Sequence, residues 1–109
     1  MVVSRLLRLS ILSIAAPLAA QSVHVVDQNN GPGTEFTTIL EALAAASDGD
    51  VLLIREGDYF FEDVLIDDMS LILQAEAGQA VSLGTVRVTG LSPDAVVVMR
   101  DIKLTGGSV

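Results

Sequence analysis

The chain carries many short apolar segments after Asp50 and never returns to a helical pattern. Turn sequences such as EGD, DDMS and TGLSPD separate these segments, which are rich in Val, Ile and Leu. Strands of three or four residues are too short to form a stable hairpin sheet alone, so they must stack on one another. The segments are VLLI (51–54), VLI (64–66), LIL (71–73), VSL (81–83), VRV (86–88), VVV (96–98) and IKL (102–104).

Three of the segments have a polar residue in the middle, which is the period of two of a strand with one buried face. We therefore expect their flanking side chains to point inward. These are Val81 and Leu83, Val86 and Val88, and Ile102 and Leu104.

The segments also recur at long, similar steps. Val64 precedes Val86 by 22 residues, Leu71 precedes Val96 by 25, and Val81 precedes Ile102 by 21. Steps of roughly 20 to 29 residues are typical of solenoid turns, in which strands pair in parallel with those of the turns above and below. A small antiparallel sandwich or an open barrel is the competing interpretation.

A single helix is predicted ahead of these strands. VHVVD (23–27) reads as a strand and QNNGPG (28–33) as a turn. Thr38 and Glu41 form a capping box, and SDGD (47–50) ends the helix with a glycine. A two-turn helix is marginal alone and must pack on something. Its predicted apolar face consists of Ile39, Ala42, Leu43 and Ala46.

The first 22 residues read as an export signal. Arg5 and Arg8 supply the basic region, residues 9–18 a short apolar stretch, and small residues follow at Ala19, Ala20 and Ser22. The stretch is too short to span a bilayer. We expect a mature chain from residue 23 that is secreted or displayed at the cell surface; an uncleaved anchor or a buried helix is the alternative.

The charge of the chain argues against several partners. The full sequence has six basic and fourteen acidic residues, a net charge of −8. Removal of the signal leaves four basic against fourteen acidic residues, which is a formal charge of −10. Such a chain does not attract nucleic acid or anionic membranes. The absence of cysteine excludes disulfides and thiol chemistry, and no cofactor motif is present.

The order of these features resembles a known superfamily. The run GPGTEFTTILEALAAASDGDVLLIREGDY, then VLIDDMSLILQAEAG and VVVMRDIKLTGGS, resembles the N-terminal part of secreted right-handed parallel β-helix proteins of the pectin-lyase-like superfamily. The resemblance covers residues 23–109. It implies an all-β fold, a right-handed parallel β-helix whose open N-terminal end is capped by a short α-helix. It also implies that this solenoid is incomplete at its C-terminal end.

The resemblance implies less about function. The superfamily contains polysaccharide lyases, hydrolases and pectinesterases, and also non-enzymatic surface proteins, so fold does not select among them. No residue of this chain matches a catalytic motif, and none is assigned as catalytic. We expect the N-terminal part of a protein that contacts polysaccharide, and a structural or adhesive solenoid is the alternative.

Arg100 and Asp101 are the candidate ligand-binding residues, because an arginine can pair with the carboxylate of a sugar acid through two hydrogen bonds. A local ion pair or simple solvation is the competing interpretation. The lone His24 is expected to face solvent from its strand. Glycan stacking is one role for the aromatic run of residues 59–61, and packing under the helix is the more economical one.

Acidic residues offer weaker candidates. Glu62, Asp63, Asp67 and Asp68 have the oxygen ligands that Ca²⁺ prefers, but turn residues between strands explain them as well. Glycoside hydrolysis needs two carboxyl groups at a defined separation, and Glu62 and Asp101 are the pair to consider. Their positions in the sequence give no reason to place them together.

The last expected turn, residues 96–107, is followed by no cap. Terminal repeats need a polar cover for solubility. We expect either that further turns follow in a longer protein or that this end associates with a second copy.

Overall fold

The computed structural model describes residues 21–105 of the chain. The predicted signal peptide lies outside this range except for Gln21 and Ser22. The elements, in chain order, are β1 (Val23–Val26), α2 (Ile39–Ala45), β2 (Asp50–Ile54), β3 (Gly57–Asp67), β4 (Leu71–Ala75), β5 (Val81–Thr89), β6 (Val97–Arg100) and β7 (Ile102–Leu104).

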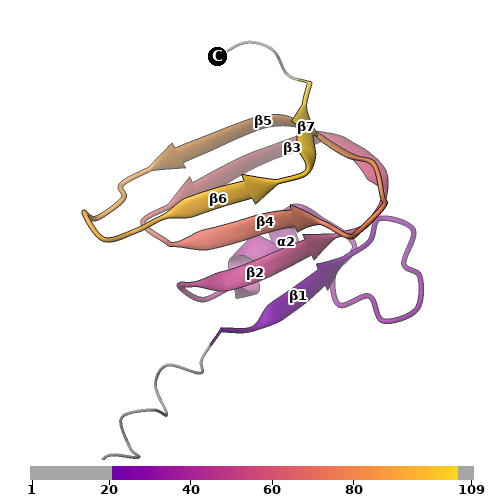
Figure 1. Ribbon diagram of the computed structural model, residues 1–109, viewed down its shortest axis with the longest axis horizontal. Helices are drawn as coiled ribbons and strands as arrows, with labels where there is room; N and C mark the ends of the chain where they lie inside the picture. Colours follow the sequence, from indigo (N-terminus) through magenta and orange to yellow (C-terminus); the bar gives the residue numbers. More distant parts are fainter. Residues whose placement is uncertain (1–20, 106–109) are drawn as a thin grey trace, which may run out of the picture.

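The strands form two parallel sheets between which the chain alternates. Sheet A has the order β1-β2-β4-β6 and sheet B the order β3-β5-β7. Figure 1 shows the strands of sheet A side by side, with β3 and β5 behind them. Every pairing between these strands is parallel, so the antiparallel sandwich is wrong.

The register confirms two of the three predicted pairings. Val64 pairs with Val86, and Val81 pairs with Ile102. Leu71 pairs with Val97 rather than Val96. The amide of Leu71 instead donates to the carbonyl of Val96, and the amide of Val96 donates to the hydroxyl of Ser70, so Val96 ends the turn before β6.

Two strands are longer than the sequence pattern predicts. β3 has 11 residues and extends the segment at 64–66 back to Gly57, and β5 has 9 residues and joins the segments at 81–83 and 86–88. In the β3–β5 pair Tyr59 lies opposite Leu83, whereas Asp63 lies opposite Thr85. Residues 60–62 of β3 therefore face only Gly84, which makes a bulge in sheet B.

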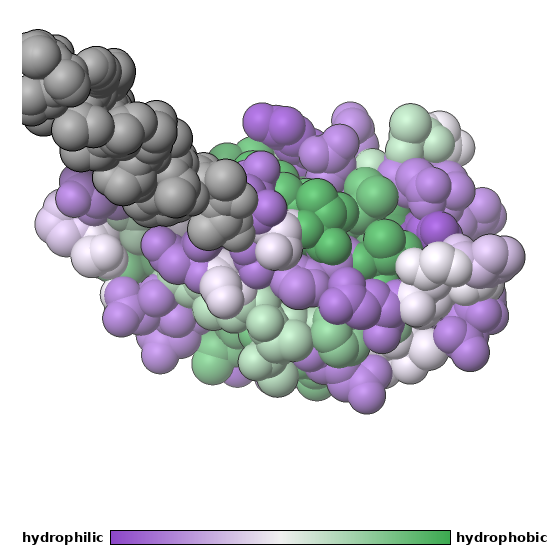
Figure 2. All heavy atoms as spheres, turned by 90° about the horizontal axis from the view of Figure 1, so that it is seen from below, coloured by the Kyte–Doolittle hydropathy of each residue, from purple (hydrophilic) through white to green (hydrophobic). Residues whose placement is uncertain are grey.

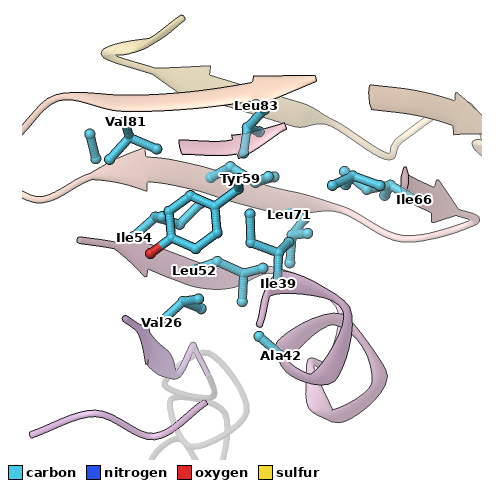
Figure 3. Close-up of a cluster of buried hydrophobic side chains, with 13 residues drawn as sticks. Val26, Ile39, Ala42, Leu52, Ile54, Tyr59, Ile66, Leu71, Val81 and Leu83 are labelled. Atoms are coloured by element: carbon cyan, nitrogen blue, oxygen red, sulfur yellow. The ribbon is translucent and has the colours of Figure 1, made fainter. Parts of the chain in front are cut away.

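The core lies between the two sheets and α2, as Figure 3 shows. Inward and outward side chains alternate along β2 and β4, as a sheet with one buried face requires. The fully buried large side chains are Val26, Ile39, Leu52, Ile54, Tyr59, Val64, Ile66, Leu71, Leu73 and Leu83.

The expected inward positions are confirmed only in part. Val81 and Leu83 are buried, and Val86 and Ile102 pack against the core, but Val88 is 41% and Leu104 48% exposed. Val88 is exposed because it lies on β5, one strand beyond Ile66 of β3, and α2 packs on β3 and β1 and does not cover β5. Leu104 belongs to β7, the edge strand of sheet B.

The helix begins as predicted and packs on the first strands of both sheets. Thr38 Oγ1 accepts a hydrogen bond from the amide of Glu41, which confirms Thr38 as the N-cap. Glu41 Oε1 accepts from the hydroxyl of Thr38 at 3.1 Å and not from its amide, so only the N-cap half of the capping box is confirmed. Ile39 and Ala42 are buried on the predicted face. Because α2 contacts both β3 and β1, it covers the side of the core where both sheets begin.

The outer face of sheet A is largely apolar. Most of its outward positions are half-buried, including Val25, Val51, Leu53, Ile72 and Val98, whereas Val23 and Arg100 are exposed. Figure 2 looks at the molecule from the side of β1, the edge strand of sheet A, so that the sheet is not seen face on; hydrophobic atoms gather in the middle of this view, with hydrophilic atoms around them.

Candidate functional site

The bulge in β3 turns two phenylalanines into solvent. Phe60 is 60% and Phe61 64% exposed, whereas Tyr59 before them and Glu62 after them are buried. The two rings lie edge to face, with centroids 5.9 Å apart and planes at 77°. The expectation that the aromatic run packs under the helix is therefore wrong for Phe60 and Phe61. Of the three residues, only Tyr59 is buried in the core.

Contacts around the bulge fix the backbone that carries this pair. The amide of Phe60 donates to Asp58 Oδ1 at 3.2 Å, and the hydroxyl of Ser82 donates to the same oxygen at 3.0 Å. A Cβ atom at Gly84 would collide with the carbonyl oxygen of Phe60, so glycine is needed where β5 passes the bulge.

Glu62 anchors the bulge from the inner side. Its carboxylate accepts hydrogen bonds from the amides of Ile39, at 3.0 Å, and Leu40, at 2.9 Å, which are the first amides of α2. These amides have no partner within the helix, so the carboxylate satisfies them. Glu62 is thereby engaged in capping, which leaves it unsuited to the calcium or acid roles considered from sequence.

Charged side chains follow the phenylalanines along the outer face of sheet B. Asp63 accepts from Arg87 at 3.2 Å, and both side chains are exposed. Asp67 accepts from the hydroxyl of Thr89 at 2.9 Å. Asp58 and Asp63 are the exposed carboxylates nearest to the aromatic pair along β3, and Lys103 of β7 lies two strands from Asp58 in the register.

Arg100 lies on the other sheet from the aromatic pair, and Asp101 lies between the two sheets in the chain. Arg100 is exposed at the end of β6 in sheet A and lies opposite Gln74. Asp101 has a left-handed backbone, with φ of 57°, in the turn to β7. It lines a pocket of about 470 Å³ together with Val81, Ser82 and Lys103. The ion pairs within residues 21–105 do not include Arg100 with Asp101.

The remaining acidic candidates do not converge. Asp68 lines a polar pocket of about 240 Å³ with Asp48 and Asp94, in the turns before β2, β4 and β6. Across residues 21–105, however, no group of three or more His, Asp or Glu side chains is arranged to hold a metal ion.

His24 faces inward, so the expectation of a solvent-facing residue is wrong. Its side chain is only 12% exposed, with Nε2 2.9 Å from Asp50 Oδ2 and Nδ1 3.2 Å from Glu35 Oε1. The ring also lies beside Phe36. The register explains the orientation, since His24 pairs with the buried Leu52.

This cluster shifts the acidity of both partners. The hydrogen bond to Asp50 raises the pKa of His24 against the opposing effect of burial, and Glu35 adds to the rise. Burial alone would raise the pKa of Asp50, but hydrogen bonds from the amides of Ser47 and Ser22 and from His24 outweigh it and lower that pKa. The arrangement joins β1 to the start of β2.

A second ionic cluster was not found from the sequence. Asp27, Arg55 and Glu76 each follow directly on a strand of sheet A, so the parallel register stacks them. Arg55 Nε lies 2.9 Å from Glu76 Oε1, and Arg55 Nη1 lies 3.4 Å from Asp27 Oδ2 and 2.5 Å from the carbonyl of Pro32. These contacts tie the turn after β1 to the sheet. Aligning the strand ends by their repeat step would have revealed the cluster.

Comparison of the chain with known proteins found no similar protein. No protein-family model matches the chain, and neither curated proteins nor solved structures show a significant match. Residues 21–105 also contain no helix of the length and hydropathy needed to cross a membrane.

Proposed function

We propose that this chain is the N-terminal part of a secreted, right-handed parallel β-helix that contacts polysaccharide. Strands that alternate between two parallel sheets, with partners 21 to 28 residues apart, support the solenoid. The helix α2 packs on the first strand of each sheet, as a cap would.

The observation that carries the contact with polysaccharide is the exposed pair of Phe60 and Phe61. Two large apolar rings in solvent are unfavourable unless a partner covers them. A sugar ring offers C–H groups on its faces, which pack on aromatic rings, and hydroxyl groups at its rim, which bond to nearby carboxylates. The role proposed here is binding, with no catalytic residue.

The alternative is a structural or adhesive solenoid that self-associates through β6 and β7. Both are edge strands, which offer unpaired backbone groups to another chain. Large apolar side chains are exposed at this end, among them Val96, Met99 and Leu104.

Retention on immobilised polysaccharides, together with sedimentation, tests both functions. We expect the chain produced in an exporting host to be retained on at least one polysaccharide, and the double variant Phe60→Ala/Phe61→Ala to be washed off. Leu65→Ala is the matched control, because Leu65 is an exposed apolar residue on the same strand but not aromatic. Lack of retention on every polysaccharide would overturn the proposal, and concentration-dependent assembly in that case would favour the alternative.

A further inference from the structure

The chemistry around Phe60 and Phe61 restricts which polysaccharide the pair can bind. We propose that the site takes an uncharged polysaccharide and rejects polyuronates. This inference rests on the function proposed above and specifies the ligand class of the same site.

The aromatic pair has the shape of a corner. With ring planes at 77° and centroids 5.9 Å apart, the two faces form a corner rather than a flat platform. One ring can lie under a sugar while the other bounds its edge. A sugar with an apolar face fits this corner, which has room for about one or two sugar units of a polysaccharide.

The backbone of that corner is rigid. Phe60 is held through its amide by Asp58, and its carbonyl lies against Gly84. Glu62 fixes the other end of the bulge to α2. A site whose backbone is set in advance loses less conformational entropy on binding, so a small aromatic surface can still give measurable affinity.

The charge beside the corner restricts the ligand further. Asp58 uses Oδ1 for its hydrogen bonds with Phe60 and Ser82, and its Oδ2 accepts none of the hydrogen bonds found within residues 21–105. A free carboxylate oxygen accepts from sugar hydroxyls and repels a sugar carboxylate. In the register Lys103 lies opposite Ser82, which lies opposite Asp58, so one exposed lysine lies two strands from this carboxylate; Arg87 lies opposite Leu65 and is paired with Asp63.

The whole chain adds a negative field. Its net charge of −8 repels polyanions over a longer range at low salt. Arg100, the residue suited to a sugar carboxylate, lies on the other sheet and so cannot offset Asp58 at the corner.

The test compares binding of the full chain, as an exporting host yields it, to soluble β-glucan, xylan, mannan and polygalacturonate of similar length. We expect at least one neutral polymer to bind, with little dependence on salt because the ligand is uncharged. Phe60→Ala and Phe61→Ala should each weaken binding by about tenfold, whereas Leu65→Ala and Arg100→Ala should change it less than about twofold.

A charge variant separates a ligand contact from a structural effect. Asp63→Asn removes a carboxylate and releases Arg87, so it should increase retention of polygalacturonate at low salt while neutral binding stays within about twofold. Thermal unfolding of each variant checks that the fold is retained.

The outcomes distinguish the two proposals. Tighter binding of polygalacturonate than of any neutral polymer, lost in Arg100→Ala, would overturn the ligand class and keep the contact with polysaccharide. Binding of neutral polymers that survives both phenylalanine variants would overturn the site. No binding to any polymer would overturn the proposed function itself.

Discussion

Sheet A and sheet B are both parallel, yet they differ in regularity and in what they expose. Each pairing in sheet A runs in continuous register, and its outer positions are mostly half-buried aliphatic residues. Sheet B has a register shift between Tyr59 and Asp63, and its outer face carries charges and two exposed phenylalanines. Regular pairing leaves side chains in fixed alternation, whereas a bulge redirects them. The irregular sheet is therefore where we expect recognition.

The largest effect should come from the shared core, which holds both sheets together. Leu52 and Leu53 are neighbours on β2, but Leu52 is fully buried and Leu53 lies on the outer face. Leu52→Ala should lower the free energy of unfolding by about 2–5 kcal/mol, because it leaves a cavity. Leu53→Ala, the matched control, should lower it by less than about 1.5 kcal/mol. Denaturant unfolding measures both, and similar losses would mean that the assignment of inner and outer faces is wrong.

The next effect should be confined to the bulge of sheet B. Gly84→Ala places a Cβ against the Phe60 carbonyl, so backbone must shift, at a cost of about 1–3 kcal/mol. Thr85→Ala, at the next and exposed position, should change stability by less than about 0.5 kcal/mol. Chemical denaturation measures the two variants. A neutral Gly84→Ala would show that β5 does not pass so close to the bulge.

The link from the bulge to the helix should contribute somewhat less. Glu62→Gln keeps the size of the side chain but removes its charge and one of its two acceptor oxygens, and we expect a loss of about 1–2 kcal/mol. Asp63→Asn, in an exposed ion pair, should cost less than about 1 kcal/mol. Helical circular dichroism and unfolding curves report the change; equal effects would contradict the capping role of Glu62.

The smallest effect should be the pH dependence contributed by His24 at the edge of sheet A. Its pKa is raised above the ordinary 6.5, so the stabilisation is complete below pH 6.5 and is lost as pH rises through the raised value. The pKa of Asp50 is lowered from 3.8, so its part is present above pH 3.8 and is lost as pH falls through the lowered value.

Comparison with His24→Gln isolates this contribution. The native chain should be more stable than the variant by about 1 kcal/mol or less at about pH 5.5, and this advantage should shrink by about pH 8.5. Thermal unfolding at the two pH values measures the difference. An advantage that grew with pH would mean that His24 does not bind its carboxylate partners as a cation.

The parallel strands and the helix followed from sequence because they rest on local, repeated signals. The N-cap at Thr38 and the step from Val64 to Val86 needed no tertiary information. The bulge did not follow, because the run Tyr59-Phe60-Phe61-Glu62 has no turn residue, and its alternation changes only where Gly84 of a distant strand lies opposite. For the same reason the capping by Glu62 and the inward turn of His24 needed the register between strands.

Arg100 and Asp101 were selected for their chemical types, and the structure places Arg100 on sheet A and Asp101 in the turn to β7, beside a pocket that Ser82 also lines. Their proposed role in binding remains a prediction, which the Arg100→Ala variant tests. The expectation of contact with polysaccharide came from the resemblance to a superfamily, but the location we now favour came from the exposure of Phe60 and Phe61.

The most direct test of the contrast between the two sheets is an NMR titration of the full chain, produced in an exporting host, with a soluble neutral oligosaccharide. We expect chemical-shift changes at the amides of Asp58, Phe60 and Phe61 in sheet B, with little change at Leu53 and Val98 on the outer face of sheet A. Changes centred on Arg100 and the outer face of sheet A, with Phe60 and Phe61 unaffected, would contradict this expectation.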